Sequence, residues 1–159
     1  MVADGPLPLS HQAWVYALLQ EANFDPWESV ESAYHRALAC SPDTPGQALA
    51  VLRLQHITET KRMYWGVIAG ALGLNLAVPH ALPGLLRWEL EAATGLSEQQ
   101  LARNLEYGGR TFSVAGLLRF SARHSVWHAG QAAQALGAAA AGAAEYGTMA
   151  PAPEFLYNT

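Results

Sequence analysis

The sequence has a single cysteine, little charge and no cluster of basic residues. One thiol, Cys40, excludes a disulfide within the chain and fits the reducing cytoplasm. The 9 Lys and Arg are scattered and outnumbered by 13 Asp and Glu, giving a net charge of −4. A nucleic-acid-binding protein would show a basic patch instead. We therefore expect a cytoplasmic protein without a nucleic-acid partner.

The sequence also lacks an apolar stretch long enough to cross a membrane. Its longest apolar run, residues 63–78, is interrupted by Gly66, Gly70 and Asn75 and is followed by Pro79. A spanning helix needs about 20 apolar residues. The N-terminus has neither the basic region nor the long apolar region of a secretory signal. We expect no membrane span and no signal peptide, and we interpret the run as buried or as part of a subunit contact.

Period-two alternation, the pattern of a half-buried strand, is missing too, and apolar residues instead recur in steps of three and four. The 51% hydrophobic content is enough for the core of one domain, which we place at residues 1–159 with a tail at 147–159. Whether residues 10–40 form one kinked helix or two is left open. Cap residues and breaks predict an all-α four-helix bundle, with helical segments near residues 10–24, 26–39, 45 to at least 64 and a turn or two beyond, 85–94, 97–105 and 114–136. The predicted caps include Ser10, Asp25 and Ser97, and residues 107–110 are predicted to form a loop.

His124 and His128 lie four residues apart in the last predicted helix, a spacing that places two side chains on one face. The seam of this helix, where apolar residues are expected, carries four polar side chains in succession: Ser121, His124, His128 and Gln131. Burying such groups without partners costs about 1–3 kcal/mol each, so a compensating interaction is expected. His56 has a similar inward position in the helix near residues 45–64.

Three imidazoles on two helices can bind one metal ion, because zinc takes nitrogen ligands at about 2.0–2.1 Å. We predict a metal site formed by His56, His124 and His128; the alternative is a polar cluster without metal. A metal-bound imidazole is usually oriented by a partner on its other nitrogen. The candidates for that role, or for substrate binding, are Glu59, Ser121 and Gln131. We expect the other histidines to be surface or hydrogen-bonded residues: His11, His35 and His80.

Two familiar kinds of metal site are excluded by what surrounds the histidines. A zincin protease needs His-Glu-x-x-His, in which the Glu is the general base, and this chain has Ser125 in that position. A di-iron bundle needs several inward carboxylates and paired Glu-x-x-His motifs, whereas the glutamates here are scattered.

The histidine pattern resembles the DinB/YfiT-like superfamily, the DNA-damage-inducible four-helix-bundle metalloproteins. The resemblance is carried by His56, by His124-x-x-x-His128-Ala-Gly-Gln131, and by the segments 96–101 and 110–118 that lead into the last helix. It covers residues 46–137 well and 8–40 loosely. The chain departs from the family pattern in the helical insertion at 26–40 and in its Ala-rich end.

The resemblance implies a bundle with a long crossover between its second and third helices, here residues 66–84. It also implies nickel or zinc held by the three histidines with open positions for water, and often a homodimer. Better-understood branches of the family use low-molecular-weight thiols.

Two functions follow. The first is a metal-dependent thiol S-transferase that acts on small electrophiles, with Arg53, Arg103, Arg110 or Arg123 as candidates for holding the carboxylates of the thiol. The second is a non-catalytic metal-binding or stress-response protein. An open coordination position facing accessible space would favour the enzyme, and a fourth protein ligand would favour a structural site.

Overall fold

The computed structural model describes residues 10–137, so the predicted tail and the Ala-rich stretch from residue 138 lie outside the described residues. The described part is mostly helical, as predicted, with one small two-stranded sheet. Its elements are α1 (His11–Phe24), α2 (Val30–Ala39), α3 (Gln47–Leu72), α4 (Leu82–Thr94), α5 (Glu98–Ala102), β1 (Asn104–Tyr107), β2 (Arg110–Ser113) and α6 (Val114–Ala135).

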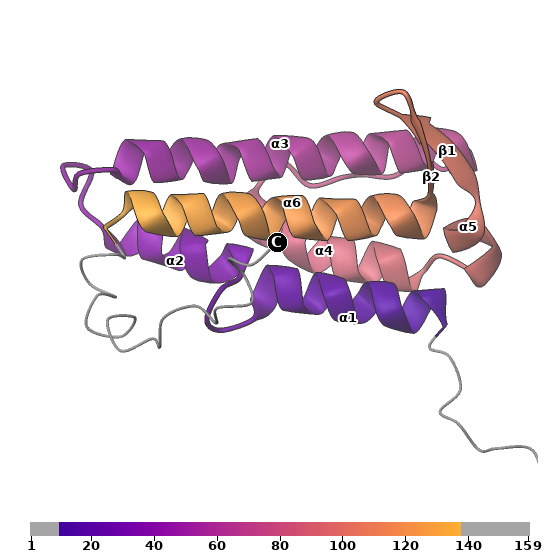
Figure 1. Ribbon diagram of the computed structural model, residues 1–159, viewed down its shortest axis with the longest axis horizontal. Coiled ribbons are helices and arrows are strands. Elements are labelled where there is room, and N and C mark those ends of the chain that lie inside the picture. The colour runs from indigo at the N-terminus through magenta and orange to yellow at the C-terminus, as the bar shows by residue number, and fades with distance from the viewer. Residues whose placement is uncertain (1–9, 138–159) are drawn as a thin grey trace, which may run out of the picture.

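The long helices lie side by side along one axis, and α6 contacts α1, α2 and α3 (Figure 1). α3 and α6 run in opposite directions, so the start of α3 lies beside the end of α6. The β1–β2 hairpin stands at the opposite end, beside the end of α3 and the start of α6. In the described part of the chain, no helix combines the length and the apolar character that a membrane crossing requires.

Residues 10–39 form two helices rather than one. The Ser10 hydroxyl caps α1 by accepting a hydrogen bond from the Ala13 amide. The prediction that Asp25 caps the second helix is wrong: α2 begins at Val30, and its cap is Ser29. Asp25 instead accepts a hydrogen bond from the Trp27 amide, which makes a turn of residues 25–29.

α3 continues through the Gly-rich run to Leu72, where Gly73 ends it in a left-handed conformation with a φ of 65°. The predicted crossover at 66–84 is therefore too long, because its first seven residues are helical and α4 already starts at Leu82. The connection is residues 73–81, which run back along the bundle to the start of α4 (Figure 1).

The sequence pattern does not predict the hairpin, because it indicates a helix at residues 97–105 and a loop at 107–110. The strands pair in antiparallel register, with Leu105 opposite Phe112 and Tyr107 opposite Arg110. Gly108 and Gly109 link them with φ values of 58° and 73°. Two successive positive φ angles are the geometry of the tight hairpin turn that matches strand twist, and glycine adopts it without steric cost.

Within residues 10–137, the core consists of two buried clusters. The larger one joins α1, α3, α4, α6 and the base of the hairpin, and Leu19, Trp65 and Leu117 are among its fully buried members. The smaller one lies at the other end and includes Val30 on α2 and Ile57 on α3. The burial of Val30 and Ala33 shows that α2 is an integral part of the bundle rather than an appendage.

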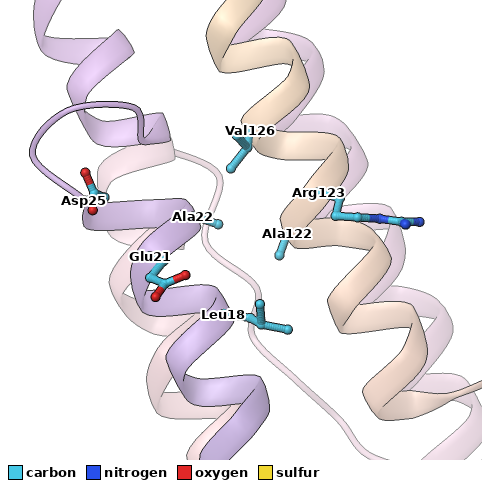
Figure 2. A pocket seen from close by; sticks show the side chains of 7 residues that line it. All are labelled: Leu18, Glu21, Ala22, Asp25, Ala122, Arg123 and Val126. Carbon is cyan, nitrogen blue, oxygen red and sulfur yellow. The ribbon is translucent and has the colours of Figure 1, made fainter. Parts of the chain in front are cut away.

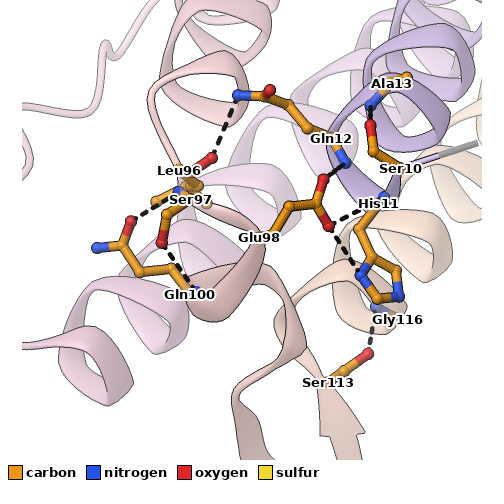
Figure 3. Close-up of polar contacts among 10 residues, drawn as sticks. All are labelled: Ser10, His11, Gln12, Ala13, Leu96, Ser97, Glu98, Gln100, Ser113 and Gly116. Atoms are coloured by element: carbon orange, nitrogen blue, oxygen red, sulfur yellow. Dashed lines mark hydrogen bonds and ion pairs between the residues drawn. The ribbon is translucent and has the colours of Figure 1, made fainter.

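The carboxylate of Glu98, at the start of α5, caps the first turn of α1 from a distant part of the sequence (Figure 3). It accepts hydrogen bonds from the backbone amides of His11 and Gln12 at 3.1 and 3.0 Å, and from His11 Nδ1 at 3.1 Å. These contacts lower the pKa of Glu98, the Gln12 amide contributing most. The first amides of a helix have no partner within it, so an anion there satisfies them and interacts favourably with the helix dipole.

Candidate metal centre

The three predicted ligands are brought together between α3 and α6. His56 lies near the middle of α3, and His124 and His128 lie one turn apart on α6. A close approach of the two helices fixes their spacing: a Cβ added to Gly46, just before α3, would lie 1.6 Å from the Ala135 carbonyl oxygen. Only glycine fits at this position, which also has a φ of 82°.

The ligand atoms of His56, His124 and His128 all lie within 4.8 Å of one another. Nε2 of His124 and Nε2 of His128 are 3.1 Å apart. Two nitrogens bound to one ion at 2.0–2.1 Å are separated by about 2.9 Å at a right angle and about 3.4 Å at the tetrahedral angle. The observed separation lies between these values, so the histidines could hold a metal ion.

Gln131 fixes the orientation of one imidazole. Its Oε1 lies 2.8 Å from Nδ1 of His128, and an amide oxygen can only accept, so Nδ1–H donates. The proton of a neutral ring is then on Nδ1, and Nε2 keeps the lone pair that faces His124. This is the tautomer and orientation that a metal ligand requires.

The other two candidates for supporting residues differ from Gln131. Ser121 is buried, and its hydroxyl has no hydrogen-bond partner among the described residues, nor has Nδ1 of His124 one turn away. Glu59 is exposed and acts on His56 through its charge. The structure therefore brings one candidate into contact with a predicted ligand and leaves two unpaired polar groups on the same face of α6.

The electrostatic environment lowers the pKa of two of the imidazoles, those of His56 and His124. Burial is the main cause that lowers the pKa of His56, followed by His128 and Arg53, with Glu59 acting in the opposite direction. Burial also lowers the pKa of His124, followed by His128, His56 and Lys61. Because a metal binds the neutral ring, a lowered pKa extends the pH range in which the site can be occupied.

Aromatic and apolar side chains surround the histidines. The Phe120 ring stacks on His124 with a centroid separation of 6.1 Å, and the Arg123 guanidinium lies over Phe120. Tyr64 meets His124 edge-on, and burial together with the neighbouring Tyr107 raises the pKa of Tyr64 well above its usual range. Large apolar side chains near the site in sequence are solvent-exposed: Leu52 by 60%, Met63 by 43% and Trp127 by 69%.

The remaining histidines lie elsewhere, as predicted. His11 is exposed and bonded to Glu98, and His35 and His80 are exposed. Of the four candidate arginines, Arg53 acts on His56 through its charge and Arg123 lies near the site through Phe120. Arg103 and Arg110 are exposed, before β1 and in β2 respectively.

Two surface grooves lie apart from the histidines. One, of about 240 Å³, runs between α1 and α6 with an apolar floor that includes Leu18 and Ala122 (Figure 2). Arg123 borders it, with its side chain extending away from α1. The other, of about 380 Å³, is lined by residues of α2 and α3 together with Leu82.

A buried polar cluster next to the site was missed from the sequence. Lys61 and Glu89 form an ion pair with both side chains fully buried, and their N–O distance is 2.5 Å. Asn23 and Trp65 also donate hydrogen bonds to the Glu89 carboxylate. The available signal was that Lys61 falls on the buried row of α3, four residues after Ile57, where a charge needs a partner.

Comparison of the chain with protein-family models, with curated proteins and with solved structures finds no match.

Proposed function

We propose that His56, His124 and His128 bind one divalent metal ion, nickel or zinc. The observation that carries this proposal is the group of three imidazole nitrogens within 4.8 Å of one another, donated by two helices. The hydrogen bond from His128 to Gln131 supports it, because it directs the lone pair of Nε2 into the group. We also propose that the chain is a DinB/YfiT-like four-helix bundle with residues 73–81 as its crossover.

We propose further that the site transfers a low-molecular-weight thiol to small electrophiles. In the part of the chain that the structure describes, the group has three donors and no fourth His, Cys, Asp or Glu. Three protein ligands with an open position are typical of a catalytic metal site. A divalent ion there lowers the pKa of a bound thiol or water, which supplies a nucleophile near neutral pH.

The chain's own residues would position the reactants. Gln131 holds the His128 ring, and the half-buried Phe120 offers an aromatic surface beside His124. Arg53 and Arg123 bring positive charge close to the histidines, which suits the carboxylates of a cellular thiol. The thiol proton passes to water as the sulfur forms a bond to the electrophilic carbon. A leaving group then departs with its bonding electron pair or, where the electrophile is an activated double bond, the π pair moves away from the attacked carbon and takes up a proton from water.

We propose a homodimer in the cytoplasm, formed through the 63–78 region. Gly66 and Gly70 lie one turn apart on α3, both are exposed, and a Cβ at either would meet open space. Such a pair lets another helix approach closely.

The test is metal content per chain in untagged protein, measured by elemental analysis. About one equivalent of nickel or zinc is expected in the wild type and in the control His80→Ala, whose histidine is exposed and outside the group. His124→Ala should lose it. Absence of metal from the wild type after reconstitution would refute the site and leave a polar cluster.

Thiol transfer is tested on the same metal-loaded protein by conjugating simple thiols to a chromogenic electrophile. Turnover that His124→Ala lacks and His80→Ala retains would support the enzyme. Full metal occupancy without turnover would favour the non-catalytic metal-binding function instead.

A further inference from the structure

A continuous row of aromatic rings leads from the three-histidine group to the hairpin. Tyr64 meets His124 edge-on at a centroid separation of 6.1 Å, and Tyr107 meets Tyr64 edge-on at 5.3 Å. Phe120 stacks on His124 and also contacts Tyr64 at 5.9 Å. The row therefore connects the candidate metal ligands with a residue of β1 that lies 17 positions from His124 in the sequence.

The hydroxyl of Tyr107 has a poor hydrogen-bond acceptor. It donates to Met63 Sδ at 4.0 Å, and a thioether is a weak acceptor. The Tyr64 hydroxyl also interacts with that of Tyr107, which contributes to the raised pKa of Tyr64 after its burial. Tyr107 is half-buried and Met63 is 43% exposed, so a molecule from solvent can reach this position. Because the thioether is a weak acceptor, an oxygen atom of a ligand could replace it as the acceptor of the hydrogen bond from this hydroxyl.

The position of this hydroxyl relative to the histidines follows from α3. His56 and Met63 are seven residues apart, which places them on the same helix face and about 10.5 Å apart along the axis. The half-buried Thr60 lies between them on that face. The Tyr107 hydroxyl lies at Met63, so the rise of about 10 Å along α3 between residues 56 and 63 indicates the length of molecule that could reach from the histidines to this hydroxyl.

The hairpin holds Tyr107 in place. Tyr107 pairs with Arg110 as the last pair before the turn, and both turn glycines have positive φ angles. The first strand pair, Asn104 with Ser113, joins directly to α6 because Ser113 is also its N-cap. The hairpin thus ties the phenol to the helix that carries His124 and His128.

We propose that Tyr107 contacts the ligand and determines specificity at the three-histidine site. Its hydroxyl donates a hydrogen bond to an oxygen of a small molecule whose other end binds at the histidines, about 10 Å away. The ligand class is a thiol with an apolar or aromatic middle, which lies over Phe120 and Met63, and a carboxylate or carbonyl oxygen at its far end. This inference rests on the proposed metal and thiol function.

The experiment uses the full chain loaded with cobalt(II), whose absorption reports a bound thiolate directly. Three thiols serve as probes. In 8-mercaptooctanoate the sulfur and the carboxylate are about 10 Å apart when the chain is extended. Octane-1-thiol lacks the carboxylate acceptor, and in 3-mercaptopropanoate the carboxylate is too close to the sulfur to reach Tyr107. The variant is Tyr107→Phe, and the control is Tyr16→Phe, an exposed tyrosine on α1. Circular dichroism and cobalt content verify that each protein is folded and loaded.

The wild type and Tyr16→Phe should bind 8-mercaptooctanoate about tenfold more tightly than octane-1-thiol, the usual effect of a hydrogen bond to a charged group. In Tyr107→Phe this ratio should fall close to one while the affinity for octane-1-thiol stays unchanged. The affinity for 3-mercaptopropanoate should not respond to the variant.

Three outcomes would overturn the inference. An unchanged ratio in Tyr107→Phe would show that the hydroxyl does not contact the carboxylate. An equal loss for 8-mercaptooctanoate and octane-1-thiol would assign Tyr107 a purely structural role. A loss for 3-mercaptopropanoate would place the carboxylate contact close to the metal. Failure of the proposed function looks different, because no cobalt would bind or no thiolate absorption would appear, and the inference would then fail with it.

Discussion

Two polar clusters on α3 lie only five residues apart and differ in how their polar atoms are used. Around Lys61, the Glu89 carboxylate accepts hydrogen bonds from Lys61, Asn23 and Trp65, and all four residues are buried. Around His56, the three imidazoles are half-buried. Nδ1 of His128 is bonded to Gln131, Nε2 of His128 and Nε2 of His124 face each other at 3.1 Å, and Nδ1 of His124 has no partner among the described residues. The first, closed cluster pairs its two charges inside the core, although the Oδ1 atom of Asn23 has no partner among the described residues. The second, open cluster keeps a ring lone pair available for a ligand.

The difference shows that buried polarity alone does not identify a binding site. A satisfied ion pair in a core contributes little net stability, but the removal of one partner leaves an uncompensated buried charge. Ring nitrogens that lack hydrogen-bond partners are instead stabilised when they bind a ligand. The two clusters should therefore respond in opposite ways to substitution and to metal.

The largest effect is expected from breaking the closed cluster. Lys61→Met leaves the Glu89 carboxylate buried without its cation, and we expect a loss of about 3–5 kcal/mol in the free energy of unfolding. The double variant Lys61→Met, Glu89→Gln should recover more than half of the loss, because the buried charge is gone. The amide oxygen of the glutamine still accepts from either Trp65 or Asn23, which donate to different oxygens of the Glu89 carboxylate. Urea unfolding of the metal-free proteins measures both. Equal instability of the single and double variants would contradict this account.

Metal should stabilise the protein through the open cluster alone. With free zinc at about 100 times its dissociation constant, we expect about 2.7 kcal/mol of added stability in the wild type. His56→Leu should abolish this gain while its metal-free stability stays close to that of the wild type. Thermal unfolding with and without metal gives the comparison. A metal-dependent gain that persists in His56→Leu would place the ion elsewhere.

Gln131 offers a graded way to weaken the open cluster. Gln131→Ala removes the acceptor of His128 Nδ1–H, and we expect metal affinity to fall about 10- to 100-fold. Competition with a chromophoric chelator measures the affinity. Gln134→Ala, an exposed glutamine on the same helix, is the matched control and should have no effect. Similar losses in both variants would argue against a specific role for the hydrogen bond.

The smallest effect is expected from pH on the metal-free protein. His56 and His124 have pKa values below 6.5 in the folded state, so the unfolded chain binds more protons and stability falls as pH drops below about 6.5. The contribution of Glu98, whose pKa is also lowered, is present above about pH 4.5 and is lost as pH falls further. Unfolding curves across this range should show both losses. His56→Leu should reduce the first loss only, and Glu98→Gln the second only.

The helices were largely predictable, because caps and apolar periodicity act locally. Ser10 and Ser97 were identified as caps, and the last helix was placed within one or two residues of its observed bounds. α3 ends at Leu72, close to the extra turn or two predicted beyond residue 64, although Gly66 and Gly70 disfavour a helix by up to about 1 kcal/mol each. Burial of Trp65 and Ile68 outweighs that cost, and this packing is not visible in a local pattern.

The hairpin and the closed cluster escaped prediction for a related reason. Four-residue strands are too short for a period-two pattern to stand out, and their pairing depends on a glycine turn. Lys61 and Glu89 are 28 residues apart, so only the fold brings them together. The histidine group was predictable because His124 and His128 share one face of a helix. Among the remaining histidines, His56 was the one on the predicted inward face of another helix.

The bond between Glu98 and the start of α1 also sets an order of events during synthesis. His11 and Glu98 are 87 residues apart, so α1 leaves the ribosome about 4–17 s before its capping residue has been made, at about 5–20 residues per second. During that interval its first amides are satisfied by Ser10 and water alone. α6, which supplies two of the three imidazoles, follows later still. The three histidines can therefore come together only after α6, the last helix of the described chain, has been synthesised.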